Sequence, residues 1–187
     1  MIDNPIGDGQ WVLVAGNDGL LRCLQAEDGQ EVWSYMTDNY INGAPAMLDN
    51  QRIIFGGCDA FLHIVNVESG EAIEQYETTA YIPSSVAVYD GIGYSGNYAN
   101  EVLAFDPGDR GELWVYSDRQ FPFFSSPAVN EEFVFIGSRD KRLHAIDRES
   151  GSAAWAFRTS GRVDGSPLAF SDAVVFASTD GWLYAVR

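Results

Sequence analysis

Short apolar segments separated by turn residues recur along the whole chain with a fixed period. The segments are rich in valine, isoleucine, leucine and aromatic residues, as in Phe133-Val134-Phe135-Ile136. One apolar position repeats at spacings of 41, 40, 41 and 40 residues, as Leu21, Leu62, Val102, Leu143 and Leu183. A repeat of about forty residues indicates a solenoid or a propeller rather than an ordinary globular fold.

Each repeat predicts four short strands. In the fourth repeat they are Ser126–Val129, Phe133–Gly137, Leu143–Asp147 and Ala153–Phe157. The hairpins between strands carry turn residues such as Asn17-Asp18-Gly19, where glycine supplies a positive φ at little steric cost. No segment shows helical periodicity, so the pattern predicts an all-β protein.

The strands are apolar on both faces, which indicates sheets stacked face to face as in a β-propeller. We therefore predict a β-propeller of about five four-stranded antiparallel blades in one domain over residues 1–187. The predicted blades are 3–42, 43–83, 84–124, 125–164 and 165–187. The last blade lacks its outer strand. Either the chain forms a small ring with one incomplete blade, or it is part of a larger ring.

A glycine and an aromatic residue mark the outer part of each repeat. The glycines are Gly29, Gly70, Gly111 and Gly151, and the tryptophans are Trp33, Trp114 and Trp155. We expect each indole to pack between neighbouring blades, with the glycine permitting the turn before it. Glu74 takes the tryptophan position in the second repeat, so the next blade junction is predicted to be weaker.

The pattern Asp140-x-x-Leu143-x-Ala145-Ile146-Asp147-x-x-x-Gly151-x-x-x-Trp155 resembles the tryptophan-docking repeat of PQQ-like, quinoprotein-type propellers. It is equally similar to the BamB-type outer-membrane assembly lipoproteins. The resemblance covers nearly the whole chain and implies the propeller fold. It also implies a periplasmic or extracellular location, although this chain contains no predicted signal peptide. Function does not follow from the fold alone.

Composition removes several classes of partner. The formal charge is -16, with 27 acidic and 11 basic residues, so nucleic acid is not an expected partner. The same charge argues against anionic membranes, which leaves membrane contact only through a partner protein. The two cysteines, Cys23 and Cys58, are expected to be free thiols, one in a strand and one in a turn.

No convergent catalytic set is evident. His63 and His144 share one repeat column two blades apart, which predicts buried packing roles rather than a metal pair. Asp18, Asp59, Asp140 and Asp180 share another column and are expected to cap their own hairpin turns. The resemblance raises PQQ with calcium as an alternative, but the adjacent cysteine pair of those dehydrogenases is absent. We therefore predict no catalytic, cofactor or metal residues.

The loops that leave each fourth strand are the candidate binding face. Aromatics and arginine are enriched in binding hot spots. The candidate residues are Tyr40, Ile41, Tyr81, Ile82, Arg119, Phe121, Phe123 and Arg162. The alternative is that these side chains cap the central channel.

The leading hypothesis is therefore a non-catalytic scaffold that binds protein or peptide through this loop face. One alternative is a fragment or relative of a PQQ-dependent dehydrogenase, and another is the sensor domain of a longer receptor or kinase. A homodimer is expected if the propeller is an open arc whose end blades are exposed.

Overall fold

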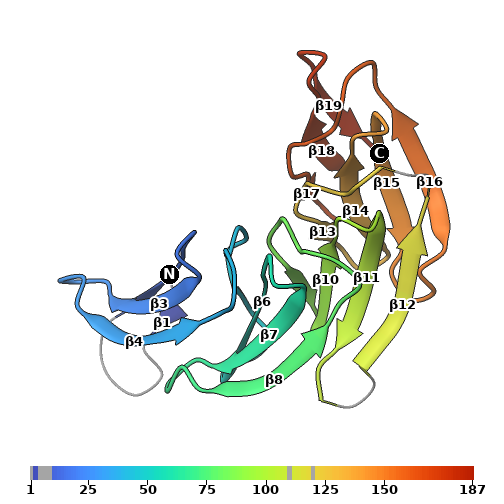
Figure 1. Cartoon of the computed structure of the whole chain (residues 1–187). Helices are drawn as coiled ribbons and strands as arrows, with labels where there is room; N and C mark the ends of the chain where they lie inside the picture. The colour runs from blue at the N-terminus through green and yellow to red at the C-terminus, as the bar shows by residue number, and fades with distance from the viewer. Residues whose placement is uncertain (1, 4–9, 109–110, 119–120) are drawn as a thin grey trace. The chain divides into compact units, whose positions relative to one another are not determined.

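The computed structural model describes residues 2–3, 10–108, 111–118 and 121–187, and all of its regular elements are strands (Figure 1). By their contacts these residues form two compact units, Met1–Val86 and Ala87–Arg187, which are described separately below. The boundary falls between the second and third repeats, the junction at which Glu74 replaces tryptophan. Among the described residues no helix is long and apolar enough to cross a membrane.

The first unit contains two four-stranded sheets. One consists of β1 (Ile2–Asp3), β2 (Gln10–Ala15), β3 (Leu20–Gln25) and β4 (Glu31–Met36). The other consists of β5 (Ala46–Met47), β6 (Arg52–Gly56), β7 (Phe61–Asn66) and β8 (Ala72–Glu77). Neighbours in each sheet are consecutive in sequence and antiparallel, as expected for propeller blades.

The second unit contains three sheets with the same strand order. The third blade holds β9 (Ala87–Tyr89), β10 (Ile92–Gly96), β11 (Glu101–Asp106) and β12 (Gly111–Ser117). The fourth holds β13 (Ala128–Val129), β14 (Phe133–Ser138), β15 (Arg142–Asp147) and β16 (Ala153–Arg158). The fifth holds β17 (Leu168–Ala169), β18 (Val174–Ala177) and β19 (Leu183–Val186).

The predicted fold class is confirmed, and the strands of the fourth repeat agree with the prediction within two residues. The innermost strand begins at Ala128 rather than Ser126, because Pro127 has no backbone N–H to contribute to a ladder. Residues 4–9 of the predicted first blade lie outside the described residues. Closure of the blades into a ring stays a prediction.

Apolar side chains fill the space between successive blades within each unit. In the first unit, Leu21 and Cys23 of β3 pack with Phe55 and Val65 of the next blade. The second unit has two such layers. One joins the third and fourth blades around Tyr94 and Ile136, and the other joins the fourth and fifth blades. Both faces of a central blade are thus buried, which explains the continuous apolar runs.

One backbone position in the hairpin before each third strand adopts a left-handed conformation. Gly19 and Gly181 have φ of 77° and 90°, as predicted for these turns. At the same repeat position, Ala60 has φ of 68° and Lys141 has φ of 71°. A side chain at such a φ costs about 1–2 kcal/mol through crowding of Cβ.

We expect Ala60→Gly to raise the free energy of unfolding by about 0.5–1 kcal/mol, because it removes this crowding at a small entropic cost. Gly181→Ala is the matched reverse substitution and should lower the free energy of unfolding by a similar amount. Urea melts of the two variants beside the parent chain measure both values. A destabilised Ala60→Gly variant would contradict the prediction.

Candidate functional site

The indole of Trp33 in β4 packs on the turn between β7 and β8 of the next blade, a contact that we call the indole clamp. Its Nε1 donates a 3.0 Å hydrogen bond to the Val67 carbonyl oxygen, and its side chain is only 8% exposed. Gly70 lies directly under the indole, where an added Cβ would be 2.6 Å from Cδ2 of Trp33. Gly70 also has φ of 72°. Only glycine satisfies both the close approach and the turn.

The same clamp recurs in the second unit. Trp114 Nε1 donates a 3.0 Å hydrogen bond to the Arg148 carbonyl oxygen, and Gly151 lies under its ring. A Cβ on Gly151 would also be 2.6 Å from the indole. The turn glycine of one repeat therefore packs against the tryptophan of the preceding repeat, a partnership that sequence reasoning missed.

The other members of these columns behave differently. Trp155 is half-buried and contacts the ring of Phe135 at a centroid distance of 5.8 Å. Gly29 and Gly111 have positive φ, of 73° and 66°, but no indole lies beneath either glycine. Their role in the described structure is therefore confined to the turn.

A buried chain of hydrogen bonds links the first two blades. The Tyr35 hydroxyl lies 3.0 Å from His63 Nδ1, and His63 Nε2 lies 2.9 Å from Asp59 Oδ2. The His63 and Asp59 side chains are 2% and 6% exposed. Gln75 Nε2 donates to the Tyr35 hydroxyl oxygen, so that hydroxyl is free to donate to Nδ1. This assigns neutral His63 with its proton on Nε2, held by Asp59.

The second unit repeats this arrangement. His144 lies with Nδ1 3.0 Å from the Tyr116 hydroxyl and Nε2 3.2 Å from Asp140 Oδ2. Burial raises the pKa of Tyr116 to about 12. Both histidines thus have the buried roles expected from sequence. Asp59 also accepts from the backbone N–H of Phe61, as predicted for a turn cap.

Asp118 brings a second carboxylate near His144, 3.9 Å from Nδ1. Asp118, Asp140 and His144 are close enough together to be considered as a metal site. However, Arg142 lies 3.9 Å from Asp118 and 3.8 Å from Asp140, so a cation already faces both carboxylates. Tyr116 and Asp140 occupy the two ring nitrogens of His144. The cluster therefore has the features of a structural ion-pair network.

The His63 network predicts a pH-dependent stability. Burial lowers the pKa of His63 below its ordinary value of 6.5, and this outweighs the opposing effect of Asp59. The unfolded chain therefore binds the proton first, and the contribution to stability is complete above pH 6.5 and lost as the pH falls below it. We expect the loss between about pH 7 and pH 5 to be smaller in His63→Gln, as measured by denaturant melts. Equal losses in both proteins would contradict the assignment.

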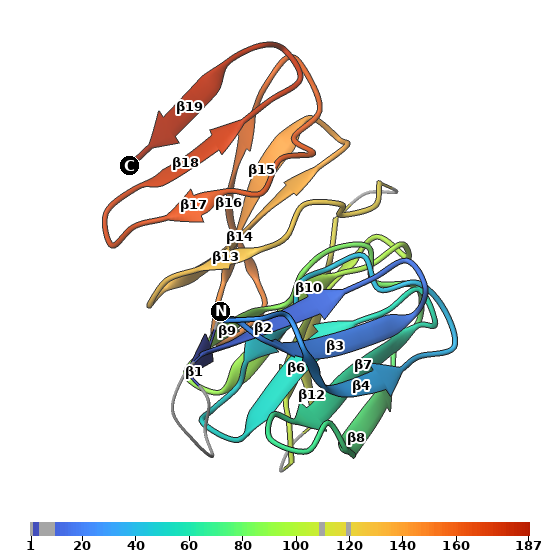
Figure 2. The ribbon, with the colours of Figure 1, turned by 90° about the vertical axis from the view of Figure 1, so that its left-hand side faces the viewer.

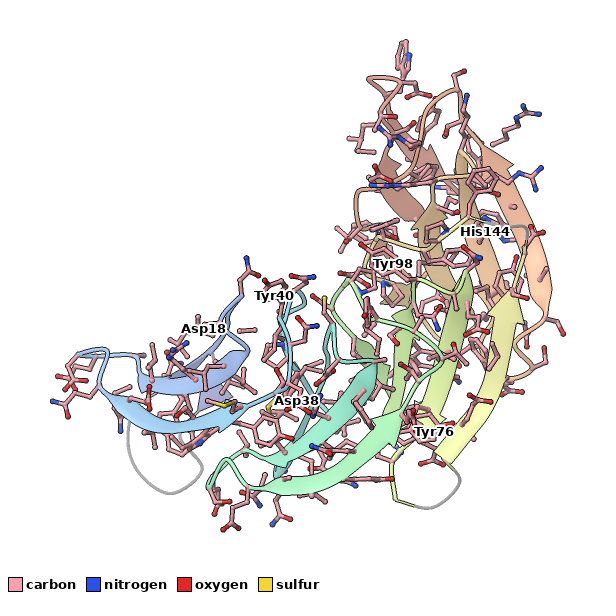
Figure 3. All side chains as sticks on the ribbon, in the orientation of Figure 1. Asp18, Asp38, Tyr40, Tyr76, Tyr98 and His144 are labelled. Carbon is pink, nitrogen blue, oxygen red and sulfur yellow. The ribbon has the colours of Figure 1, made fainter. Side chains whose placement is uncertain are left out.

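The predicted loop face is only partly exposed. Tyr40 is 57% exposed and Tyr81 is 51% exposed. Tyr40 lies in the loop that leaves β4 (Figure 3). In contrast, Ile41, Ile82 and Phe123 are buried, with at most 2% exposed, and so they cannot contact a partner. For these three residues the predicted binding role is wrong.

The physical reason is the path of the loop between blades. The residue after each exposed tyrosine turns inward and bonds to the hairpin before it, as when Ile41 N–H donates to the Gly16 carbonyl. Ile82 repeats this with the Gly57 carbonyl. Phe123 belongs to this inward column rather than to the tyrosine column, because its counterpart one repeat later is the buried Val163.

The remaining candidates lie in the second unit. Phe121 is 45% exposed, and the side chain of Arg162 is 53% exposed with its Nε 3.9 Å from Asp164. Arg119 lies outside the described residues. Phe124, three residues after Phe121 in the sequence, has the guanidinium of Arg139 over its ring, with Cζ 3.9 Å from the ring centroid. These residues are on loops equivalent to those of the two tyrosines in the first unit.

An open cavity of about 330 Å³ lies beside Tyr40. Its lining includes the Asn17–Gly19 hairpin and the segment from Thr37 to Asn39. Thr37 holds this corner together, since its hydroxyl oxygen lies 2.6 Å from the Asn39 carbonyl oxygen and 3.0 Å from that of Gly19, and its single proton is donated between them. The exposed ring of Tyr40 and the side chains of Asp18 and Asp38 therefore line the same cavity, and Thr37 anchors the loop beside it.

Comparison with known proteins identifies one family. The sequence model of the family described as "Outer membrane protein assembly factor BamB" matches residues 2–80 and 98–187. The Outer membrane protein assembly factor BamB of Alkalilimnicola ehrlichii is 28% identical over 97 residues, 51% of this chain and 24% of that protein. Its counterpart from Marinobacter adhaerens is 32% identical over 82 residues, 42% of this chain and 21% of that protein.

Solved structures show the same fold. BamB from Moraxella catarrhalis matches with a TM-score of 0.78 and 20% identity, covering 95% of this chain and 57% of that one. The computationally designed Ika8 protein matches with a TM-score of 0.83 and 18% identity, covering 96% of this chain and 56% of that one. The chain thus spans little more than half the length of these structures, and a quarter or less of each curated relative is matched.

Proposed function

Since the chain belongs to the family of the outer membrane protein assembly factor BamB, we propose that it is a non-catalytic propeller scaffold that binds protein or peptide segments. The proposed site in the first unit is the loop face carrying Tyr40 and Tyr81. We further propose that the protein works in the periplasm or outside the cell, as the family name suggests.

The observation that carries the proposal is the contrast between exposed and buried positions in these loops. Tyr40 and Tyr81 present their rings to solvent, while the adjacent Ile41 and Ile82 are fully buried. The Tyr40 carbonyl also accepts a 2.8 Å hydrogen bond from the Cys58 N–H, so the backbone is held on both sides. A rigid aromatic side chain loses little entropy on binding, which favours affinity.

The charge of the first unit further restricts the class of molecule that it can bind. The first unit has only two basic residues, and both are in ion pairs: Arg22 with Asp18 and Arg52 with Asp49. A polyanion therefore finds no unpaired cation among the described residues of this unit. This supports a protein or peptide partner rather than nucleic acid.

The PQQ-dependent dehydrogenase remains the rival function. Cys23 is buried in a strand and Cys58 lies in a turn, and both are free thiols. They do not fit the adjacent cysteine pair that the resemblance implies for the cofactor site, so we derive no step through PQQ. Tight binding of added PQQ with calcium, together with dye-linked alcohol oxidation, would favour the rival over the scaffold.

The loop face is tested with peptides selected on the protein from a phage-displayed random library. We expect Tyr40→Ser with Tyr81→Ser to weaken the selected peptides by about tenfold or more, since two aromatic contacts are removed. Ile73→Ser is the matched control, because Ile73 is 50% exposed on β8, away from these loops. Equal affinity for the double variant and the parent chain would overturn the proposed site.

A further inference from the structure

Several cations gather at one end of the fourth blade. β15 lies between β14 and β16 in that blade, so the β14–β15 turn, the start of β15 and the end of β16 are neighbours (Figure 2). These three places hold Arg139, Lys141, Arg142 and Arg158. The formal charge of the whole chain is -16, so positive charge is concentrated here in a molecule that is otherwise strongly acidic.

Two of these arginines directly face each other. Arg142 and Arg158 are Cα partners across the β15–β16 pair. Like charges at directly opposite positions destabilise a sheet. At the same positions the first three blades have Leu20 with Met36, Phe61 with Glu77, and Glu101 with Ser117. Of the four four-stranded blades described, only the fourth places two cations opposite each other here.

Lys141 occupies a strained position beside this pair. It is the only lysine of the chain, and its φ of 71° is disfavoured for any side chain with a Cβ. Its carbonyl oxygen accepts a 2.9 Å hydrogen bond from the N–H of Thr159, the residue after Arg158, so Lys141 is held next to Arg158. Backbone strain and a like-charge pair are both local costs, and such costs are found where a site serves a ligand.

The nearby carboxylates leave two of the cations without an ion-pair partner. The Arg142 guanidinium lies 3.9 Å from Asp118 and 3.8 Å from Asp140, and so faces both carboxylates. Lys141 and Arg158 are exposed, and neither forms an ion pair with any residue that the structure describes. These two side chains are therefore available to an anionic group.

An aromatic surface borders these cations. The guanidinium of Arg139 lies over the Phe124 ring, and its Nε is 3.2 Å from Asp164 Oδ1, which fixes its position. Phe124 in turn contacts the Tyr98 ring edge-on, at a centroid distance of 4.9 Å. Tyr98, labelled in Figure 3, is 46% exposed. The surface of the second unit thus places exposed apolar rings next to unpaired cations.

We propose that this end of the fourth blade binds an acidic segment of a partner protein, with a carboxylate held between Lys141 and Arg158. An apolar side chain of the same segment packs on the rings of Tyr98 and Phe124. The bound carboxylate also offsets the repulsion between Arg142 and Arg158, so that binding relieves a cost present in the free protein. The proposal rests on the scaffold function proposed above and adds a second site, in the second unit, with its own partner chemistry.

An acidic peptide fits this surface better than other anions. A phosphate ion could contact the cations, but it would leave the neighbouring rings without a partner. A nucleic acid would be repelled by the 27 acidic residues of the chain. A peptide carries carboxylates and apolar side chains together, and this combination matches the groups that the surface presents.

The probe is a fluorescein-labelled synthetic peptide with the sequence Glu-Glu-Glu-Glu-Phe. We expect saturable binding by fluorescence anisotropy at low ionic strength, with a dissociation constant below about 1 mM. Binding should weaken as salt is added, because exposed charges are screened. Arg158→Glu and Lys141→Gly should each weaken binding by about tenfold or more, since each removes a cation that contacts the carboxylate.

Stability separates a ligand-binding role from a structural one. Arg158→Glu places opposite charges across the β15–β16 pair, and Lys141→Gly relieves the positive φ. Both variants should therefore unfold at a higher urea concentration than the parent chain. Residues with a purely structural role would not give variants that are more stable and yet bind the peptide more weakly.

Two control proteins complete the test. Arg52→Glu changes the net charge as much as Arg158→Glu but lies in the first unit, so it should leave the affinity within about twofold of that of the parent chain. Tyr40→Ser with Tyr81→Ser should also leave it unchanged, which separates this experiment from the test of the loop face.

Three results would overturn the proposal. The first is the absence of saturable binding up to about 1 mM peptide. The second is equal affinity of the parent chain and the folded Lys141→Gly and Arg158→Glu variants, or equal weakening by Arg52→Glu. The third is a saturable shift of the Lys141 amide resonance with inorganic phosphate but not with the peptide, which would assign the cations to a phosphate site.

Discussion

Replacing Trp33 with alanine is expected to lower the free energy of unfolding by about 3–5 kcal/mol, in the range of large core truncations. The substitution removes a side chain that is 8% exposed, together with its hydrogen bond to the Val67 carbonyl. It also leaves Gly70 without the ring that covers it. Guanidinium melts followed by circular dichroism measure the loss.

Trp155→Ala is the matched comparison. Trp155 is half-buried beside a cavity and clamps no turn within the described residues, so its truncation should cost clearly less than that of Trp33. If the two substitutions cost the same, the indole clamp contributes nothing beyond ordinary apolar burial, and our account of Trp33 fails.

Substituting His63 with leucine is expected to cost about 3 kcal/mol or more at neutral pH. Leucine fills most of the space, but it leaves Oδ2 of the buried Asp59 carboxylate without the His63 donor and the Tyr35 hydroxyl without its acceptor. The penalty comes from the unpaired groups rather than from lost volume.

A double-mutant cycle separates these contributions. His63→Leu combined with Asp59→Asn replaces the buried charge by a neutral amide, so the pair should be less destabilising than the sum of the single changes. Simple additivity, measured by urea melts of the four proteins, would show that the two side chains do not act together.

The fold was predictable because the repeat leaves the same apolar positions in every blade. Both faces of strands such as β14 and β7 are buried, and an unbroken apolar run in the sequence is the direct result. The turn glycines Gly19 and Gly181 were equally visible. Ala60 and Lys141 were not, because their positive φ is imposed by the hairpin and not by the residue type.

The candidate site was harder to predict. Exposed and buried side chains alternate along the loop after each fourth strand. A loop has no fixed periodicity, so the sequence does not show which of its residues point to solvent and which point inward. Tyr81 and Ile82 are adjacent, yet one is half exposed and the other is fully buried. Ile41, Ile82 and Val163 lie at multiples of the repeat period, and Phe123 falls between the last two at the same spacing, which is the signal that could have placed Phe123 in the buried column.

The buried hydrogen-bond chains also left a signal that was not used. The tyrosine precedes the histidine by 28 residues in both units, and the aspartate precedes it by four. The tyrosine, histidine and aspartate positions each recur with the repeat. Sequence alone does not show, however, that the fourth strand of one blade contacts the third strand of the next blade. That contact depends on how the sheets stack.

The partnership between Trp33 and Gly70, and between Trp114 and Gly151, bears on how such chains gain and lose blades in evolution. Each tryptophan lies 37 residues before the glycine that it covers, so the two partners belong to successive repeats of the sequence. Duplicating or deleting one complete repeat therefore gives every internal indole a glycine again, and no new interface has to arise by mutation. An insertion or deletion of any other length would separate the partners, so we expect blade number to change in whole repeats.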